Sequence, residues 1–263
     1  MKELLQIMRR LRDPQAGCPW DLAQDFRSIA PHTLEEAHEV VDAIDRGDRE
    51  ALRDELGDLL FQVVFHSQMA AERGWFGFDD VAAGISDKLT RRHPHVFGDA
   101  SAAAGSPADS AAQVAGSWDA IKAAERTAAG DAGALAGVAL SLPALARASK
   151  LGKRASRVGF DWQDATGVRE KVIEELGEFD AALAGESPER QLDELGDLLF
   201  AISNWARHRG LDPEEALRRC NLRFESRFRA MERMALEQQA DLAGLSAGQW
   251  EALWAAAKRQ EGP

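Results

Sequence analysis

The chain contains the same acidic pattern twice, at a constant separation of 139 residues. The segment that starts at Asp54, DELGDLLF, recurs letter for letter from Asp193, and the EExxE segment that starts at Glu35 recurs from Glu174. A repeat at a fixed separation indicates one structural unit present in two copies, which constrains the architecture before any other feature is considered. Both copies place carboxylates within apolar sequence, so the repeat also indicates a functional site built from these carboxylates.

Apolar residues follow a helical period in almost every segment, and alternating runs of β-branched and aromatic residues are nearly absent. We therefore predict an all-α fold of two tandem four-helix units, residues 1–126 and 127–263, each with a trailing helix that carries Trp and Lys. Residues 99–117 are rich in Ala, Ser and Gly, which predicts a flexible stretch. The expected helices are 1–12, 31–46, 49–73, 78–92 and 118–126 in the first unit, and 142–157, 167–184, 189–209, 214–238 and 246–260 in the second.

Two local signals in the first unit lead to specific expectations. Thr33 and Glu36 have the spacing of a capping box, which predicts that a helix opens at Pro31. The segment from Gly17 to Trp20 contains Gly and Pro and is expected to form a loop.

The bulk composition narrows the classes of partner. The net charge is −12 and the isoelectric point about 5.0, which argues against nucleic acid or an anionic membrane surface as a partner. No apolar run approaches the roughly 20 residues of a membrane span, and the first residues do not resemble a signal peptide. The two cysteines, Cys18 and Cys220, provide no disulfide framework, so we expect a cytoplasmic protein.

The repeated carboxylates are candidates for a metal site. Residues three apart lie on nearly the same side of a helix, so Glu36 projects with Glu39, and Glu55 with Asp58. An unpaired carboxylate in so apolar a sequence costs several kcal/mol, and we expect the acidic helices to hold few bases on that side. Hard oxygen ligands suit Mg²⁺ or Mn²⁺ rather than zinc. The predicted ligands are Glu36, Glu39, Glu55 and Asp58 in the first half and Glu175, Glu178, Glu194 and Asp197 in the second.

Other repeated residues fit a phosphorylated, base-containing substrate. Two metal ions on four carboxylates can activate water and stabilise charge on a phosphoryl group. Basic side chains would bind phosphate oxygens, and tryptophans offer flat surfaces for a base. The candidate substrate-binding residues are Lys88, Arg92, Trp118 and Lys122 in the first half and Lys150, Arg223, Arg227, Trp254 and Lys258 in the second.

Together these motifs resemble the MazG family of all-α nucleoside triphosphate pyrophosphohydrolases. The resemblance rests on the acidic pattern and on four further segments, and it covers essentially the whole chain. These segments are CPWD from Cys18, ELGDLLFQVVF from Glu55, RRHPHVF from Arg91 and GFDW from Gly159.

The resemblance implies an activity and further roles. It implies Mg²⁺-dependent attack of water on the α-phosphate of an NTP or dNTP, giving the monophosphate and pyrophosphate, in cleansing of the nucleotide pool. It also implies a homodimer whose pockets are completed across subunits. By the same resemblance Glu39 and Glu178 are the candidate general bases, and Glu35 and Glu174 would orient water or a ligand.

The chain departs from the family pattern N-x-K-F-x-x-R near the fourth helix. The second half has Asn221 and Phe224 but Arg223 in place of the lysine, which keeps the charge and changes the geometry of phosphate binding. The first half has Ser86 where the asparagine would stand.

Two alternatives to a broad NTP hydrolase stay open at this point. One is a narrower enzyme of the same helical superfamily, acting on dUTP, dCTP or phosphoribosyl-ATP. The other is a module, above all the first half, that binds nucleotide or metal without turnover. A panel of substrates distinguishes the narrow enzyme from a broad NTP hydrolase. Site-directed variants of each half distinguish a catalytic half from one that only binds.

Overall fold

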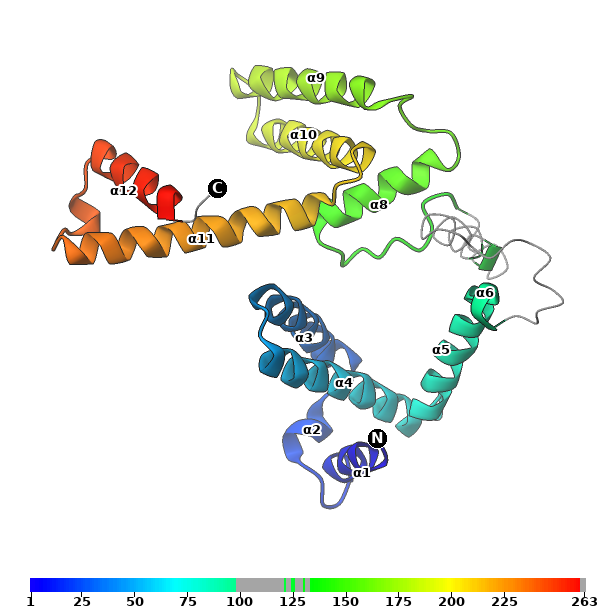
Figure 1. Cartoon of the computed structure of the whole chain (residues 1–263). Helices are drawn as coiled ribbons and strands as arrows, with labels where there is room; N and C mark the ends of the chain where they lie inside the picture. Colours follow the sequence, from blue (N-terminus) through cyan, green and yellow to red (C-terminus); the bar gives the residue numbers. More distant parts are fainter. Residues whose placement is uncertain (98–120, 122–123, 126–129, 131–132, 261–263) are drawn as a thin grey trace. The chain divides into compact units, whose positions relative to one another are not determined.

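The structure is a computed structural model that describes residues 1–97, 121, 124–125, 130 and 133–260 (Figure 1). It divides into two compact units, Met1–Ile121 and Lys122–Pro263, and each is treated by itself below. Regular structure in the described residues is helical throughout, which confirms the predicted all-α fold. The predicted boundary after residue 126 stays a prediction, and the stretch 99–117 lies outside the described residues.

The first unit is built around one helical hairpin. Helix α3 (Phe26–Arg46) runs back along α4 (Arg49–Glu72), and Gly47 joins them in the left-handed conformation, φ 65°. Helix α1 (Lys2–Leu11) packs on α4, and α5 (Phe78–Arg92) and the short α6 (Pro94–Phe97) follow it (Figure 1). The apolar core between these helices consists of Met8, Ile29, Val64, Phe65 and Met69.

Both local expectations for the first unit were wrong. Helix α3 begins at Phe26, because the carboxylate of Asp25 accepts hydrogen bonds from the backbone amides of Arg27 and Ser28, and Ser28 Oγ accepts one from the Asp25 amide. This capping box takes the place of the one predicted at Thr33, and Pro31 lies inside the helix. The expected loop through Trp20 contains a one-turn helix, α2 (Pro19–Ala23), whose first position is proline.

The second unit repeats the hairpin and adds a long helix. Helix α9 (Ala165–Leu183) pairs with α10 (Pro188–His208), and α8 (Ala144–Ser156) packs against α10. Helix α11 (Pro213–Glu237) is followed by a short 3₁₀ turn, η1 (Leu242–Gly244), and by α12 (Ala247–Gln260), which lies along the C-terminal part of α11 (Figure 1). The core of this pair consists of Ala230, Met231, Ala235, Leu253 and Ala257.

The remaining expected helices are confirmed to within a few residues at their ends, except 118–126, most of which lies outside the described residues. Among the helices that the structure describes, none combines the length and the hydropathy needed to cross a membrane.

Candidate active site

The first carboxylate cluster forms where α3 and α4 run side by side. Carboxylate oxygens of Glu36, Glu39 and Glu55 all lie within 4.8 Å of one another. Glu36 and Glu55 are half-buried and Glu39 is exposed. The fourth predicted ligand, Asp58, is exposed and lies near enough for its charge to act on both Glu36 and Glu55.

Repulsion among the carboxylates of the first cluster is offset only slightly by a cation: the charge of Arg46 lowers the pKa of Glu55, but less than the other causes raise it. Burial raises the pKa of Glu36, and the charges of Asp58 and Glu39 raise it further. Burial likewise raises the pKa of Glu55, together with Glu39 and Asp58. The group that offsets part of this for Glu36 is neutral: Gln62 Nε2 donates a hydrogen bond to Glu36 Oε1 at 3.4 Å. Gln62 is almost fully buried, and its Oε1 has no hydrogen-bond partner.

The second cluster forms in the same way between α9 and α10. Carboxylate oxygens of Glu175, Glu194 and Asp197 lie within 4.8 Å of one another. Glu175 is 7% exposed and Glu194 is 3% exposed, so two of the three ligands are more enclosed than any in the first cluster. Glu178, the fourth predicted ligand, is exposed beside them, and its pKa is raised by partial burial and by the charge of Glu175.

Two cations beside the second cluster were missed, and they correct the expectation that the acidic helices carry few bases there. Lys171 Nζ lies 2.8 Å from Glu175 Oε1, and Arg190 pairs with Glu194. The hydrogen bonds to Glu174 and Glu175 raise the pKa of Lys171 above its usual range. The signal was present in the sequence, because each cation precedes its carboxylate by four residues on the same helix, the spacing of a helical ion pair.

Glu35 and Glu174, predicted to assist in both sites, occupy equivalent exposed positions. Glu35 Oε2 lies 3.3 Å from His32 Nδ1, and Glu174 Oε1 accepts a hydrogen bond from Lys171 at 2.9 Å. Neither belongs to the groups of oxygens described above. Their assistance to catalysis stays a prediction.

The candidate substrate-binding residues of the second half gather mainly where α11 meets α12. The Arg227 guanidinium lies over the ring of Trp254, 5.5 Å from its centroid, and the Phe224 ring lies 5.7 Å from Trp254. Arg223 on α11 and Lys258 on α12 are exposed, and Lys150 is exposed on α8. In the first half Lys88 and Arg92 lie one turn apart on α5, while Trp118 and Lys122 fall outside the described residues.

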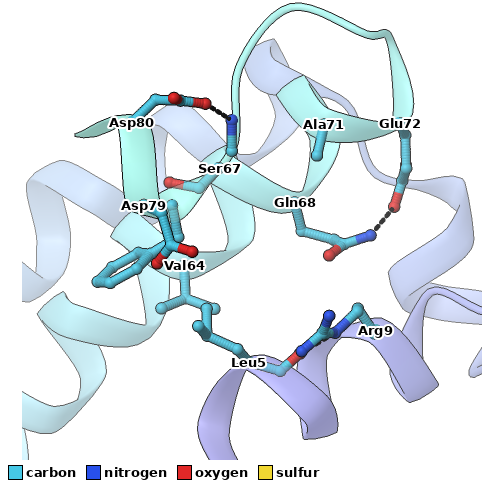
Figure 2. Close-up of a pocket in the computed structure, with 11 residues that line it drawn as sticks. Leu5, Arg9, Val64, Ser67, Gln68, Ala71, Glu72, Asp79 and Asp80 are labelled. Carbon is cyan, nitrogen blue, oxygen red and sulfur yellow. Dashed lines mark hydrogen bonds between the residues drawn. The ribbon is translucent and has the colours of Figure 1, made fainter. Parts of the chain in front are cut away.

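A separate pocket of about 470 Å³ lies between α1, α4 and α5 (Figure 2). Several polar groups that line it already bond locally: Gln68 donates to Glu72, and the Gly77 amide donates to Asp80. None of the predicted carboxylate ligands lines this pocket. The candidate site is therefore defined by the converging carboxylates and not by this cavity.

The donor set of both clusters fits a hard divalent cation. Every donor in the two groups is a carboxylate oxygen, with neither sulfur nor imidazole nitrogen among them. Spacings of up to 4.8 Å between these oxygens allow several of them to contact one ion. Magnesium and manganese prefer such ligands, whereas zinc sites in proteins generally include nitrogen or sulfur.

Comparison with known proteins agrees with this geometry in both halves. Residues 24–97 match the family model of the MazG nucleotide pyrophosphohydrolase domain, and residues 152–223 match that of phosphoribosyl-ATP pyrophosphohydrolase. Each match spans one complete carboxylate set.

Similarity to individual proteins extends over the whole chain. The chain is 49% identical over 260 residues to a nucleoside triphosphate pyrophosphohydrolase of Escherichia coli (strain K12), covering 98% of this chain and 97% of the relative. It is 41% identical over 257 residues to a nucleoside triphosphate pyrophosphohydrolase/pyrophosphatase MazG of Thermotoga maritima, covering 98% and 95%. A Mycobacterium tuberculosis nucleoside triphosphate pyrophosphohydrolase is 39% identical over 159 residues, covering 60% of this chain and 45% of the relative.

Proposed function

Because the chain belongs to the MazG family and is a nucleoside triphosphate pyrophosphohydrolase, we propose that it hydrolyses NTPs and dNTPs at the α-phosphate, with Mg²⁺ as its cofactor. The products are then the (d)NMP and pyrophosphate, and the role is removal of unwanted nucleotides from the pool. Mn²⁺ is the expected substitute for Mg²⁺, since it takes the same kind of oxygen ligands.

The observation that carries this proposal is the second cluster. Glu175, Glu194 and Asp197 bring oxygens within 4.8 Å of one another on two adjacent helices, and the first two are buried. Mg²⁺ held there would lower the pKa of water and neutralise charge on the phosphoryl group. Glu36, Glu39 and Glu55 would hold the ion in the first half, with Asp58 beside them.

Glu178 is the proposed general base of the second half. It is exposed beside the buried ligands, so water can reach its carboxylate. Its raised pKa brings its basicity closer to neutral pH, which favours proton abstraction from the attacking water. Glu39 has the equivalent place in the first half.

Substrate recognition is proposed for the basic and aromatic residues of α11 and α12. Arg223 and Arg227 lie one turn apart and would bind phosphate oxygens through their guanidinium groups. Lys258 and Lys150 would add point charges near the same anion. Trp254 would stack on the base, and stacking with few specific hydrogen bonds allows several bases to bind. Lys88 and Arg92 are the corresponding candidates in the first half.

A homodimer is part of the proposal because the helical hairpins leave large apolar side chains uncovered. On α10, Leu192 is 68% exposed and Leu199 is 43% exposed, and on α4 Leu56 is 49% exposed. Large apolar side chains that gather on an exposed surface usually mark a protein interface. Light scattering coupled to size-exclusion chromatography measures the oligomeric state directly. A monomer at micromolar concentration would contradict the proposed dimer.

Product analysis is the experiment that tests the reaction. Each NTP and dNTP is incubated with the protein and Mg²⁺, with and without EDTA, and the products are separated by anion-exchange chromatography. Monophosphate and pyrophosphate that disappear with EDTA would support the proposal, and relative rates would rank the bases. Diphosphate and inorganic phosphate as products would overturn it.

A narrower substrate is a second candidate, favoured by one specific observation. Residues 152–223 match the model of phosphoribosyl-ATP pyrophosphohydrolase and include the whole second carboxylate set. We therefore include phosphoribosyl-ATP, dUTP and dCTP in the same panel. A kcat/KM for one of them at least a hundredfold above that for the common NTPs would replace the broad activity with the narrow one.

A further inference from the structure

The two carboxylate clusters differ in how their charge is balanced. In the second half each buried ligand is paired with a cation one turn earlier on its own helix, Lys171 with Glu175 and Arg190 with Glu194. Both cations contact the Oε1 atom of a carboxylate that belongs to the ligand group. One oxygen of each buried ligand is therefore already in an ion pair.

The first half has a neutral arrangement at the same positions. The residues 139 earlier in the chain are His32 in place of Lys171 and Ala51 in place of Arg190. His32 contacts Glu35 and not the ligand Glu36. Glu36 receives a hydrogen bond from the amide of Gln62, and the second half has an alanine, Ala201, at the position equivalent to Gln62.

This difference has a physical consequence for binding of a divalent cation. Buried carboxylates without compensating charge repel one another and are costly, and an added cation relieves both costs. Where a lysine and an arginine already provide that relief, an incoming ion gains less and must compete for the same oxygens. The first cluster lacks both, and the weaker effect of Arg46 on Glu55 leaves it more of its attraction for a divalent cation.

We propose that Lys171 and Arg190 are internal counterions of the second cluster, which neutralise Glu175 and Glu194 in the absence of metal and compete with a divalent cation for their oxygens. In the absence of nucleotide the second site consequently binds the cation more weakly than the first. The proposal rests on the proposed function only in taking the clusters to be cation sites.

The test measures Mn²⁺ binding to the full chain without nucleotide, by electron paramagnetic resonance of the free ion. The first cluster is disabled by Glu36→Gln and Glu55→Gln, so that binding reports on the second. Adding Lys171→Met or Arg190→Met should then tighten Mn²⁺ binding by about three- to tenfold. Lys171→Arg, which keeps the charge, should leave the affinity close to that of the parent.

Two further variants make the comparison specific. Arg229→Met removes an arginine from another i,i+4 pair, with Glu225 on α11, and should leave Mn²⁺ affinity unchanged. In a chain whose second cluster is disabled by Glu175→Gln and Glu194→Gln, Ala51→Arg places a counterion in the first cluster and should weaken Mn²⁺ binding at least threefold. Circular dichroism confirms that each variant keeps its helical content.

The outcomes separate this proposal from the proposed function. An unchanged or weakened affinity in both Lys171→Met and Arg190→Met would overturn the counterion role while leaving the metal-dependent reaction intact. If neither cluster of the unmodified chain bound Mn²⁺, both the metal-dependent reaction and this proposal would be overturned. Tightening in both variants, together with weakening in Ala51→Arg, supports it.

Discussion

The guanidinium of Arg207 binds the carboxylate of Asp161 through two parallel hydrogen bonds, Nη1 to Oδ2 at 2.9 Å and Nη2 to Oδ1 at 2.6 Å. His208 Nε2 lies 2.8 Å from the same Oδ1. These contacts attach the loop that carries the GFDW segment to the C-terminal end of α10, whereas the cluster residues Glu194 and Asp197 lie in the N-terminal half of that helix. The loop leads directly into α9, so this ion pair helps to fix the hairpin that holds Glu175 and Glu194.

We expect the Asp161–Arg207 pair to stabilise the second unit in a pH-dependent way. The hydrogen bonds from Arg207 and then His208 lower the pKa of Asp161 from 3.8 to about 2. A lowered carboxyl pKa gives stability that is present above the unfolded value and is lost as pH falls through the folded value, here between about pH 4 and pH 2. The size is about 2 kcal/mol.

Arg207→Gln should therefore lower the free energy of unfolding by about 2 kcal/mol at pH 7 and flatten its decline below pH 4. Urea denaturation at a series of pH values measures both effects. Arg229→Gln removes an exposed arginine from a pair within one helix and should change stability by less than about 0.5 kcal/mol. Equal effects of the two variants would contradict the role of the Asp161 pair.

Gly152→Ala should destabilise the contact between α8 and α10. A Cβ at this position would lie 2.0 Å from Asn204 Oδ1, and Asn204 is 1% exposed and bonded to Phe200 O and Arg207 Nε. We expect a loss of about 1–3 kcal/mol in thermal or urea denaturation. Gly84→Ala is the matched control, because a Cβ there meets nothing within 4 Å and alanine favours the helix by up to about 1 kcal/mol. A neutral Gly152→Ala would show that the helices separate at little cost.

Glu178→Gln should reduce kcat by about 10²- to 10⁴-fold, because it removes the proposed base. The fold should be retained, since the change removes one charge from a group of repelling carboxylates. Initial rates of pyrophosphate release from NTPs measure the effect, and circular dichroism checks the fold. Glu39→Gln is the matched variant of the first half. Near-normal rates in Glu178→Gln, with a large loss in Glu39→Gln, would move catalysis to the first half.

Removal of metal should destabilise the first unit more at alkaline than at acidic pH. Burial and neighbouring carboxylates raise the pKa of Glu36 and Glu55 above 4.5. Raised carboxyl pKa values give stability that is full below pH 4.5 and is lost as pH rises through the folded values. Thermal melts with EDTA should therefore show this loss.

Added Mg²⁺ should reverse that loss at pH 8, by about 2.7 kcal/mol when its concentration is a hundred times the Kd. In the variant Glu36→Gln/Glu55→Gln the metal-free first unit should be more stable at pH 8, and Mg²⁺ should add little to the stability of that unit, although the second cluster can still bind it. A Mg²⁺ effect that persists undiminished in this variant would place the stabilising ion elsewhere.

Gln239→Gly should stabilise the end of α11. Gln239 has φ 54°, the left-handed conformation, which costs most residues about 1–2 kcal/mol and costs glycine little. Glycine also loses more freedom on folding, so the net gain should be about 0.5–1 kcal/mol in thermal denaturation. Gln238→Gly at φ −85° should bring no gain, and a comparable gain there would show that backbone strain is not the cause.

Helical spacing made both the fold and the carboxylate groups predictable. The i,i+3 positions of Glu36 and Glu39, and the short turn after them, determine which oxygens meet once the helices pair. The start of α3 was mispredicted because Thr33 and Glu36 match the usual capping-box letters, whereas Asp25 and Ser28 form one with a serine in the third helical position.

Other contacts in the site could not be predicted from the repeated sequence. Lys171 and Arg190 were not predicted because they are not part of the repeat: the first half has His32 and Ala51 at the equivalent positions. The stacking of Arg227 on Trp254 depends on how α12 packs along α11, and no spacing within either helix specifies it.

The short turn at Gly47, which joins α3 to α4, has a consequence for the order of folding. Every ligand of the first cluster lies on two helices that are consecutive in the chain, and the second cluster is built likewise. Contacts between segments close in sequence form fastest, because little chain entropy is lost in closing the loop between them. We expect each ligand set to assemble during synthesis as soon as its hairpin leaves the ribosome, before distant pairs such as Arg12 with Glu72 can form.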